Sequence, residues 1–139
     1  MKSALTTLSS VRARMQPDAA FRAEISVRDG RIVVLDLFGE LDSLSLARLD
    51  AALEASLAPR PETIIIDLSR TDFVSGAGYA AIGRCSRQVE RLVICCRGHV
   101  AQKVLGVLGY RDIAYVDVAV EPATRHGTPA PLVTAWPNH

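Results

Sequence analysis

The hydrophobic residues of this chain change their spacing along the sequence, and each spacing predicts a different element. Two apolar runs come first, at 21–27 and at 32–37. Between them lie Asp29 and Gly30, a pair that favours the two-residue turn of a β-hairpin. The chain is therefore predicted to open with two antiparallel strands. In the first of them the apolar side chains occupy every second position, at Phe21, Ala23, Ile25 and Val27.

Three later segments have the spacing of helices that bury one side. The first follows Asp42 and Ser43, either of which could cap it, and ends before Pro59 and Pro61. The third ends at a glycine, Gly109. The apolar positions are Leu46, Leu49, Leu53 and Leu57 in the first segment, Ala81, Ile82, Cys85 and Val89 in the second, and Val100, Val104, Val107 and Leu108 in the third.

Continuous apolar runs lie between these helices, at 64–66 and 92–96, and they are typical of parallel strands that are buried on both faces. A last short strand is predicted at 113–116. Phe73 and Val74 are expected to be core residues as well. A hairpin followed by alternating helices and strands predicts an α/β fold, with a mixed β-sheet, helices packed on it and right-handed crossovers.

Composition and charge narrow the class of protein. With 139 residues, 49% of them apolar, the chain can form one compact core, which we place at 20–120 between an N-terminal tail at 1–19 and a proline-rich C-terminal tail at 121–139. A net charge of +1 gives no basic surface for nucleic acid. No apolar run reaches the roughly 18 residues of a membrane span, and the start lacks the apolar block of a signal peptide. We therefore expect a cytoplasmic protein.

Residues suited to catalysis or metal binding are few and scattered. The cysteines, Cys85, Cys95 and Cys96, have no Cys-x-x-Cys spacing, and we expect them to be reduced core residues. Cys95 and Cys96 are neighbours on a predicted strand, so their side chains point to opposite faces and cannot chelate one metal ion. The sequence thus predicts no metal site, no cofactor and no enzyme.

The segment with the most information about function is the turn Ser75-Gly76-Ala77-Gly78, where a buried strand leads into a helix. Backbone N–H groups at a helix start lack partners within the helix and carry the positive end of its dipole, which suits an anion or a phosphorylated side chain. Ser75 is expected to cap this helix by accepting an N–H from two or three residues on. The glycines would allow positive φ or close approach.

Three stretches, in order along the chain, resemble the STAS domain of bacterial anti-sigma factor antagonists. They are Leu37-Phe38-Gly39-Glu40-Leu41-Asp42, where the family has a strand ending in Gly-Glu-Leu-Asp, the strand and turn at 64–78, and the helix at 98–110. The resemblance covers roughly residues 21–119. It implies a STAS-like fold and a binding protein that sequesters an ATP-binding serine kinase, the anti-sigma factor, and so frees a sigma factor.

By the family's pattern, Glu40, Asp42 and Ser43 would lie beside Ser75, Gly76, Ala77 and Gly78 and form the partner-binding surface with them. The family has Asp-Ser-Ser-Gly at this turn, so its phosphorylated serine falls on Gly76, which has no hydroxyl.

Ser75 is then the candidate phosphorylation site. Ser75 lies one residue before the family's phosphorylated position. A kinase needs the acceptor hydroxyl in line with the γ-phosphate of ATP. A displacement of one residue moves the hydroxyl out of line, because consecutive Cα atoms are about 3.8 Å apart. We therefore expect an antagonist without the usual phosphoserine switch.

The residues from Gly76 to Ala81 also match the dinucleotide fingerprint G-x-G-x-x-G/A. That fingerprint needs its first glycine directly after a strand, whereas the predicted strand ends at Leu68. It also needs an acidic residue at the end of the next strand, where this chain has Arg97. A small-ligand or nucleotide-binding sensor that holds an anion at this helix start is the alternative function.

Overall fold

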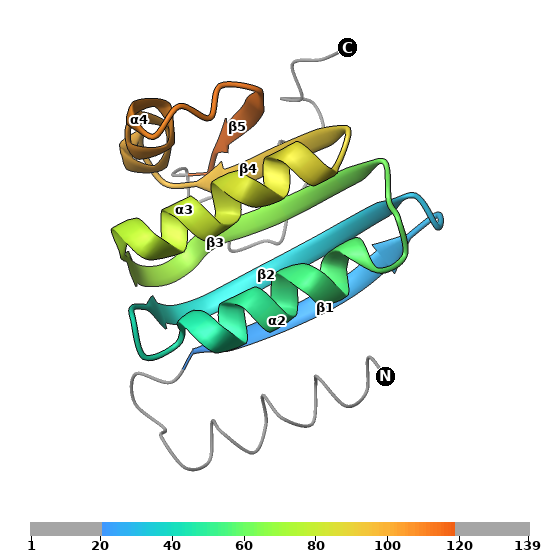
Figure 1. Cartoon of the computed structure of the whole chain (residues 1–139), viewed down its shortest axis with the longest axis horizontal. Helices are drawn as coiled ribbons and strands as arrows, with labels where there is room; N and C mark the ends of the chain where they lie inside the picture. Colours follow the sequence, from blue (N-terminus) through green and yellow to red (C-terminus); the bar gives the residue numbers. More distant parts are fainter. Residues whose placement is uncertain (1–20, 119–139) are drawn as a thin grey trace.

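The computed structural model describes residues 21–118, which form a five-stranded sheet and three α-helices (Figure 1). The predicted tails at 1–19 and 121–139 lie outside the described residues. In chain order the elements are β1 (Arg22–Arg28), β2 (Ile32–Leu41), α2 (Leu46–Leu57), β3 (Thr63–Val74), α3 (Gly76–Cys85), the 3₁₀-helix η1 (Ser86–Gln88), β4 (Arg91–Cys96), α4 (Val100–Val107) and β5 (Ile113–Asp117).

The strands lie in the sheet in the order in which they occur in the sequence. β1 pairs with β2 in an antiparallel manner, and each later pair is parallel. The predicted hairpin is confirmed, and Asp29 and Gly30 both have positive φ, 56° and 70°, as in a type I′ turn. The connection has three residues, 29–31, rather than the predicted two, because Arg28 pairs with Ile32. The predicted α/β class with a mixed sheet is also confirmed.

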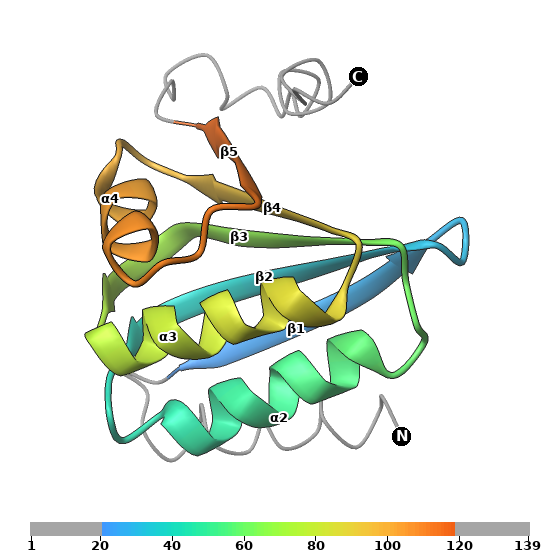
Figure 2. The ribbon, with the colours of Figure 1, turned by 45° about the horizontal axis from the view of Figure 1, so that its top comes forward.

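This strand order explains where the helices lie. From β2 to β5, every crossover moves in the same direction across the sheet and adds the next strand beside the previous one. Crossovers that share this direction and the same handedness place their helices on one face of the sheet. Figure 2 shows α2 and α3 side by side on that face. α4 joins them at the end of the row, where Ala101 and Leu105 pack into the same core cluster.

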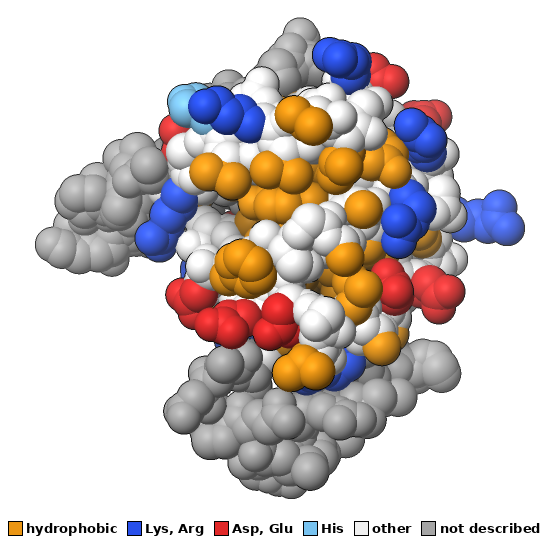
Figure 3. Space-filling view, turned by 60° about the vertical axis from the view of Figure 1, so that its left-hand side comes forward, with side chains coloured by type: hydrophobic (Ala, Val, Ile, Leu, Met, Phe, Trp, Pro, Cys, Tyr) orange, Lys and Arg blue, Asp and Glu red, His pale blue; other side chains and the backbone are white. Residues whose placement is uncertain are grey.

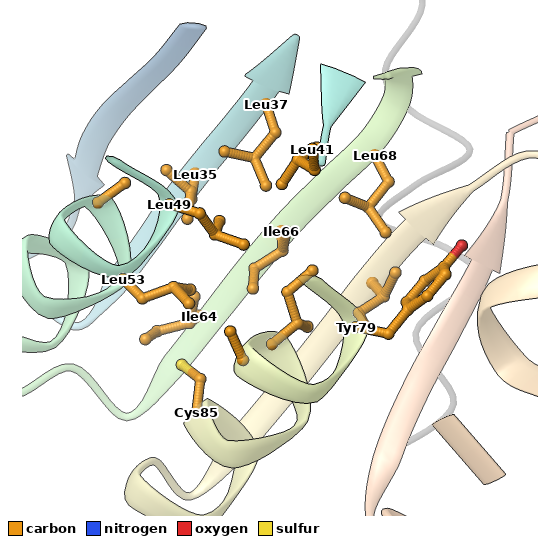
Figure 4. Packing of buried hydrophobic residues seen from close by; sticks show 14 of the residues in the cluster. Leu35, Leu37, Leu41, Leu49, Leu53, Ile64, Ile66, Leu68, Tyr79 and Cys85 are labelled. Atoms are coloured by element: carbon orange, nitrogen blue, oxygen red, sulfur yellow. The ribbon is translucent and has the colours of Figure 1, made fainter. Parts of the chain in front are cut away.

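The core fills the space between this face and the helices. Figure 4 shows the inward side chains of β2 and β3 meeting those of the first two helices. In the figure these are Leu35, Leu37, Leu41, Ile64, Ile66 and Leu68 from the strands, Leu49 and Leu53 from α2, and Tyr79 and Cys85 from α3. The apolar stripe predicted for α2 is therefore confirmed. The predicted burial of the strands at 64–66 and 92–96 is confirmed as well.

The three cysteines are free and buried, as expected. Cys96 belongs to the core beneath the helices, whereas Cys95 lies in a smaller cluster on the opposite face with Val93 and Val116. The two thiols thus point to opposite faces. Burial raises the pKa of Cys85 to about 11 and that of Cys95 to about 12, so both remain protonated thiols at neutral pH.

Two predicted helices differ from the observed ones. α3 was predicted to continue to Val89, but it ends at Cys85 and the 3₁₀-helix follows. In α4 the inward residues are Ala101, Leu105 and, in part, Val104. The inward stripe is thus rotated by about one residue from the predicted stripe, because successive residues of a helix are about 100° apart.

Phe73 is not a core residue, and its side chain is 53% exposed. Its neighbour Val74 packs against the core instead. Successive residues of a strand point to opposite faces, so only one of these two side chains can be directed inward.

Candidate functional site

The residues predicted to bind a partner are brought together at the ends of β2 and β3. In this parallel pair Glu40 lies opposite Phe73 and Leu41 lies opposite Val74. The backbone N–H of Ser75 then donates to the carbonyl of Leu41 at 2.8 Å. The segments 40–45 and 75–78, called the paired turns below, are therefore adjacent.

Ser75 caps α3 in the predicted way. Its backbone is extended, with φ −75° and ψ 166°, and its Oγ accepts from the N–H of Gly78 at 3.0 Å. Its carbonyl accepts from the N–H of Tyr79 at 2.9 Å. The start of α3 is therefore held by one hydroxyl and the backbone.

The two glycines of this turn have different roles. Neither has positive φ, so the conformational reason predicted for them is wrong. A Cβ on Gly78 would lie 3.2 Å from Cγ1 of Val74 and 3.4 Å from the carbonyl of Leu41, which shows a close approach. A Cβ on Gly76 would meet nothing within 4 Å. Gly76 and Ala77 are exposed, so this part of the turn offers bare backbone to solvent.

The start of α2 is built differently, and the predicted caps Asp42 and Ser43 are both wrong. The N-cap residue is Ser45, whose side chain makes no cap hydrogen bond. The carboxylate of Asp42 instead closes the turn before the helix, since its Oδ1 accepts from the N–H of Leu44 at 3.0 Å and of Ser45 at 3.2 Å. The side chain of Asp42 thus satisfies N–H groups of the turn, before the first residue of the helix.

Ser45 is a structural residue that the sequence analysis missed. Its side chain is only 2% exposed. Its Oγ donates to the carbonyl of Glu40 at 2.9 Å and accepts from the N–H of Asp42 at 3.0 Å. The available signal was its place directly before Leu46, the first residue of the apolar stripe, where caps are usual.

Acidic and apolar side chains surround the paired turns. Glu40 and Asp42 are half-buried, and Asp72 is exposed on β3. Leu44 is 88% exposed in the turn before α2. Figure 3 brings this end of the molecule forward and shows acidic side chains below a field of hydrophobic ones. The site therefore suits contact with another macromolecular surface.

The glycines of α3 follow β3 more closely than the sequence predicted. β3 continues to Val74, so Gly76 follows a strand almost directly, and the predicted strand end at Leu68 is wrong. The acidic residue that the fingerprint needs is absent, because β4 ends at Cys96 and Arg97 follows it. A groove of about 880 Å³ lies at the other end of α2, and none of its lining residues belongs to the paired turns.

Two further observations concern the described part of the chain. Within residues 21–118 no three histidine, cysteine or acidic side chains gather in a way that could hold a metal ion. None of the helices in this part is long and apolar enough to cross a membrane.

Comparison with known proteins identifies relatives of this chain. The STAS domain family matches residues 23–122. Anti-sigma-F factor antagonist RsfB of Mycobacterium tuberculosis is 27% identical over 81 residues, a match that covers 56% of this chain and 66% of RsfB, just under two thirds of its length.

Two solved structures have a similar fold. An anti-sigma factor antagonist from Mycobacterium paratuberculosis has a TM-score of 0.58 at 21% identity, over 66% of this chain and 80% of that chain. The unphosphorylated form of the anti-sigma factor antagonist SpoIIAA has a TM-score of 0.56 at 21% identity, over 75% of this chain and 95% of that one. These likenesses establish the SpoIIAA-like arrangement of the sheet and helices.

Proposed function

Because the chain belongs to the STAS domain family, we propose that it is an anti-sigma factor antagonist. It is a binding protein without catalytic activity of its own. In this role it sequesters an ATP-binding serine kinase that acts as an anti-sigma factor, and so frees a sigma factor in the cytoplasm. The names of the relatives support this proposal, since both RsfB and SpoIIAA are anti-sigma factor antagonists.

The observation that carries the proposed site is the hydrogen bond from Ser75 to the Leu41 carbonyl, which holds the paired turns side by side. One turn contributes Glu40, Asp42 and Ser43. The other contributes Ser75 to Gly78, where the small residues leave the helix start open to an approaching backbone or side chain. A partner can therefore contact both turns at once.

We propose further that this antagonist lacks the phosphoserine switch. Gly76 has no hydroxyl, and the Oγ of Ser75 is already engaged as the acceptor for Gly78. Binding of the kinase then does not lead to modification of the antagonist, and its partner stays sequestered until another process releases it.

Calorimetric titration against the purified ATP-binding anti-sigma factors of the same cell tests the binding. Ala77→Arg places a bulky, charged side chain on the exposed start of α3, and we expect it to abolish binding. Ala51→Arg is the matched control, because Ala51 is exposed in the middle of α2. Gly78 is unsuitable for this test since a side chain there would disturb the fold of the turn. Equal affinity of both variants would contradict the proposed site.

The same titration distinguishes the alternative function. Adding ATP or NAD to the protein alone should give no heat of binding if the paired turns serve a protein partner. Saturable nucleotide binding that Ala77→Arg removes, with no affinity for any anti-sigma factor, would instead indicate a nucleotide sensor.

Intact-mass measurement after incubation with ATP and the bound kinase tests the missing switch. We expect no mass shift in the wild-type protein. Stoichiometric phosphate that disappears in Ser75→Ala would show that Ser75 has taken over as the acceptor.

A further inference from the structure

The apolar surface of α4 is wider than the part that the core covers. Ala101 and Leu105 point inward and are buried. Val100 and Val107, seven residues apart and so on nearly the same side of the helix, are 62% and 86% exposed. Lys103 lies between them and is exposed too. We call these three residues, Val100, Lys103 and Val107, the α4 ridge.

The other two helices have charged residues at exposed positions. Asp50 and Glu54 are exposed on α2, and Arg84 is exposed on α3. Exposed apolar side chains that gather on one part of the surface are typical of a contact with another molecule.

The α4 ridge and the paired turns lie at the same edge of the sheet. The carboxyl ends of the parallel strands β2, β3 and β4 face this edge, although β4 ends several residues before β3 does. Leu44, Phe73 and Val100 each lie within four residues of the end of one of these strands. All three side chains are exposed. α3 and α4 are also in contact with each other. Figure 3 shows a band of hydrophobic side chains across this end of the molecule.

Charges of opposite sign frame this apolar band. Glu40, Asp42 and Asp72 lie on the side of β2 and β3, whereas Arg97 and Lys103 lie beside or on α4. In Figure 3 the acidic side chains gather below the band, and basic ones lie above and beside it. A partner that fits would present an apolar surface with basic residues toward the turns and acidic residues toward α4.

We propose that the α4 ridge is a second contact region for the same anti-sigma factor that binds the paired turns. This inference rests on the proposed function. A standard interface uses about 20–30 residues on each side, and the two turns alone supply far fewer. The apolar ridge at the same edge of the sheet would enlarge the interface with exposed hydrophobic side chains.

Titration of full-length variants with the anti-sigma factor that binds the wild type tests the inference. Val107→Lys adds a charge that the carboxyl end of a helix tolerates, and Val100→Glu adds one that the amino end tolerates, so both proteins should fold. We expect each to weaken binding about tenfold or more. Val27→Lys is the matched control, because Val27 is also exposed but lies on β1, where it pairs with Val33. The control should bind like the wild type.

The outcomes separate the two proposals. Binding that Ala77→Arg abolishes but Val107→Lys and Val100→Glu leave unchanged would overturn the inference and preserve the proposed function. Failure of every anti-sigma factor to bind the wild type would overturn both. Wild-type self-association in analytical ultracentrifugation, lost in Val107→Lys while the affinity for the anti-sigma factor is kept, would assign the ridge to a second copy of this chain and also overturn the inference.

Discussion

The helices α2 and α3 start side by side, yet their first turns are stabilised in different ways. Before α2, the side chains of Asp42 and Ser45 make several hydrogen bonds with the backbone between Glu40 and Ser45. At α3, a single hydroxyl, that of Ser75, caps a turn of small residues.

This difference indicates which part of the site stabilises the fold and which part is available to bind a partner. The buried hydroxyl of Ser45 is used entirely within the network before α2, so replacing Ser45 should act mainly on stability. The start of α3 exposes Gly76 and Ala77, so changes there should act mainly on binding. Substitutions at Ser45, Ser75 and Gly76 should test this division, with a decreasing effect on stability in that order.

Ser45→Ala should have the largest effect. It removes a buried hydroxyl that serves the carbonyl of Glu40 and the N–H of Asp42, and the loss should lower the free energy of unfolding by about 2 kcal/mol. Urea unfolding followed by circular dichroism measures it. Ser43→Ala is the control, because Ser43 is exposed, and it should change stability by less than about 0.5 kcal/mol. Equal losses in the two variants would show that the network is not what stabilises this turn.

Ser75→Ala should have a smaller effect, because it removes one cap hydrogen bond. We expect a loss of about 1 kcal/mol in the same unfolding measurement. Ser75→Asn retains an acceptor that suits this position and should recover most of the loss. A stability of Ser75→Asn as low as that of Ser75→Ala would contradict the capping role.

Gly76→Ser should have the smallest effect on stability, within about 0.5 kcal/mol, since a Cβ there meets open space. Gly78→Ser is the matched control, and it should cost more because its Cβ would be crowded by Val74 and Leu41. Gly76→Ser also places a hydroxyl at the family's acceptor position. Incubation with ATP and the kinase should then add phosphate to this variant alone, and an unmodified Gly76→Ser would show that the missing switch has another cause.

Much of the fold could be predicted from local patterns. Alternation at 21–27, the Asp29-Gly30 turn and the leucine stripe of α2 each depend on residues close in sequence, so strand, turn and helix follow from steric and capping rules. The Ser75 cap also needs only its neighbour three residues on. The junction at 75–78 was therefore located correctly from the sequence.

Other features depend on residues that are distant in sequence. The inward side of α4 is chosen by the core that it meets, so a short helix with apolar residues on a wide arc has no single predicted orientation. The crowding of Gly78 arises from Val74 and from the carbonyl of Leu41, which belongs to another strand. No periodicity within α3 carries that information.

The sequence by itself determined the α/β class, the order of the elements and the missing hydroxyl at Gly76, because these follow from local spacing and residue identity. Only the tertiary structure decided which hydrogen bond joins 40–45 to 75–78, that Gly76 has open space for a side chain while Gly78 is crowded, and that Val100 and Val107 face outward. The physical reason is that strand pairing and helix packing join segments tens of residues apart, and the space left around each side chain is known only after they meet.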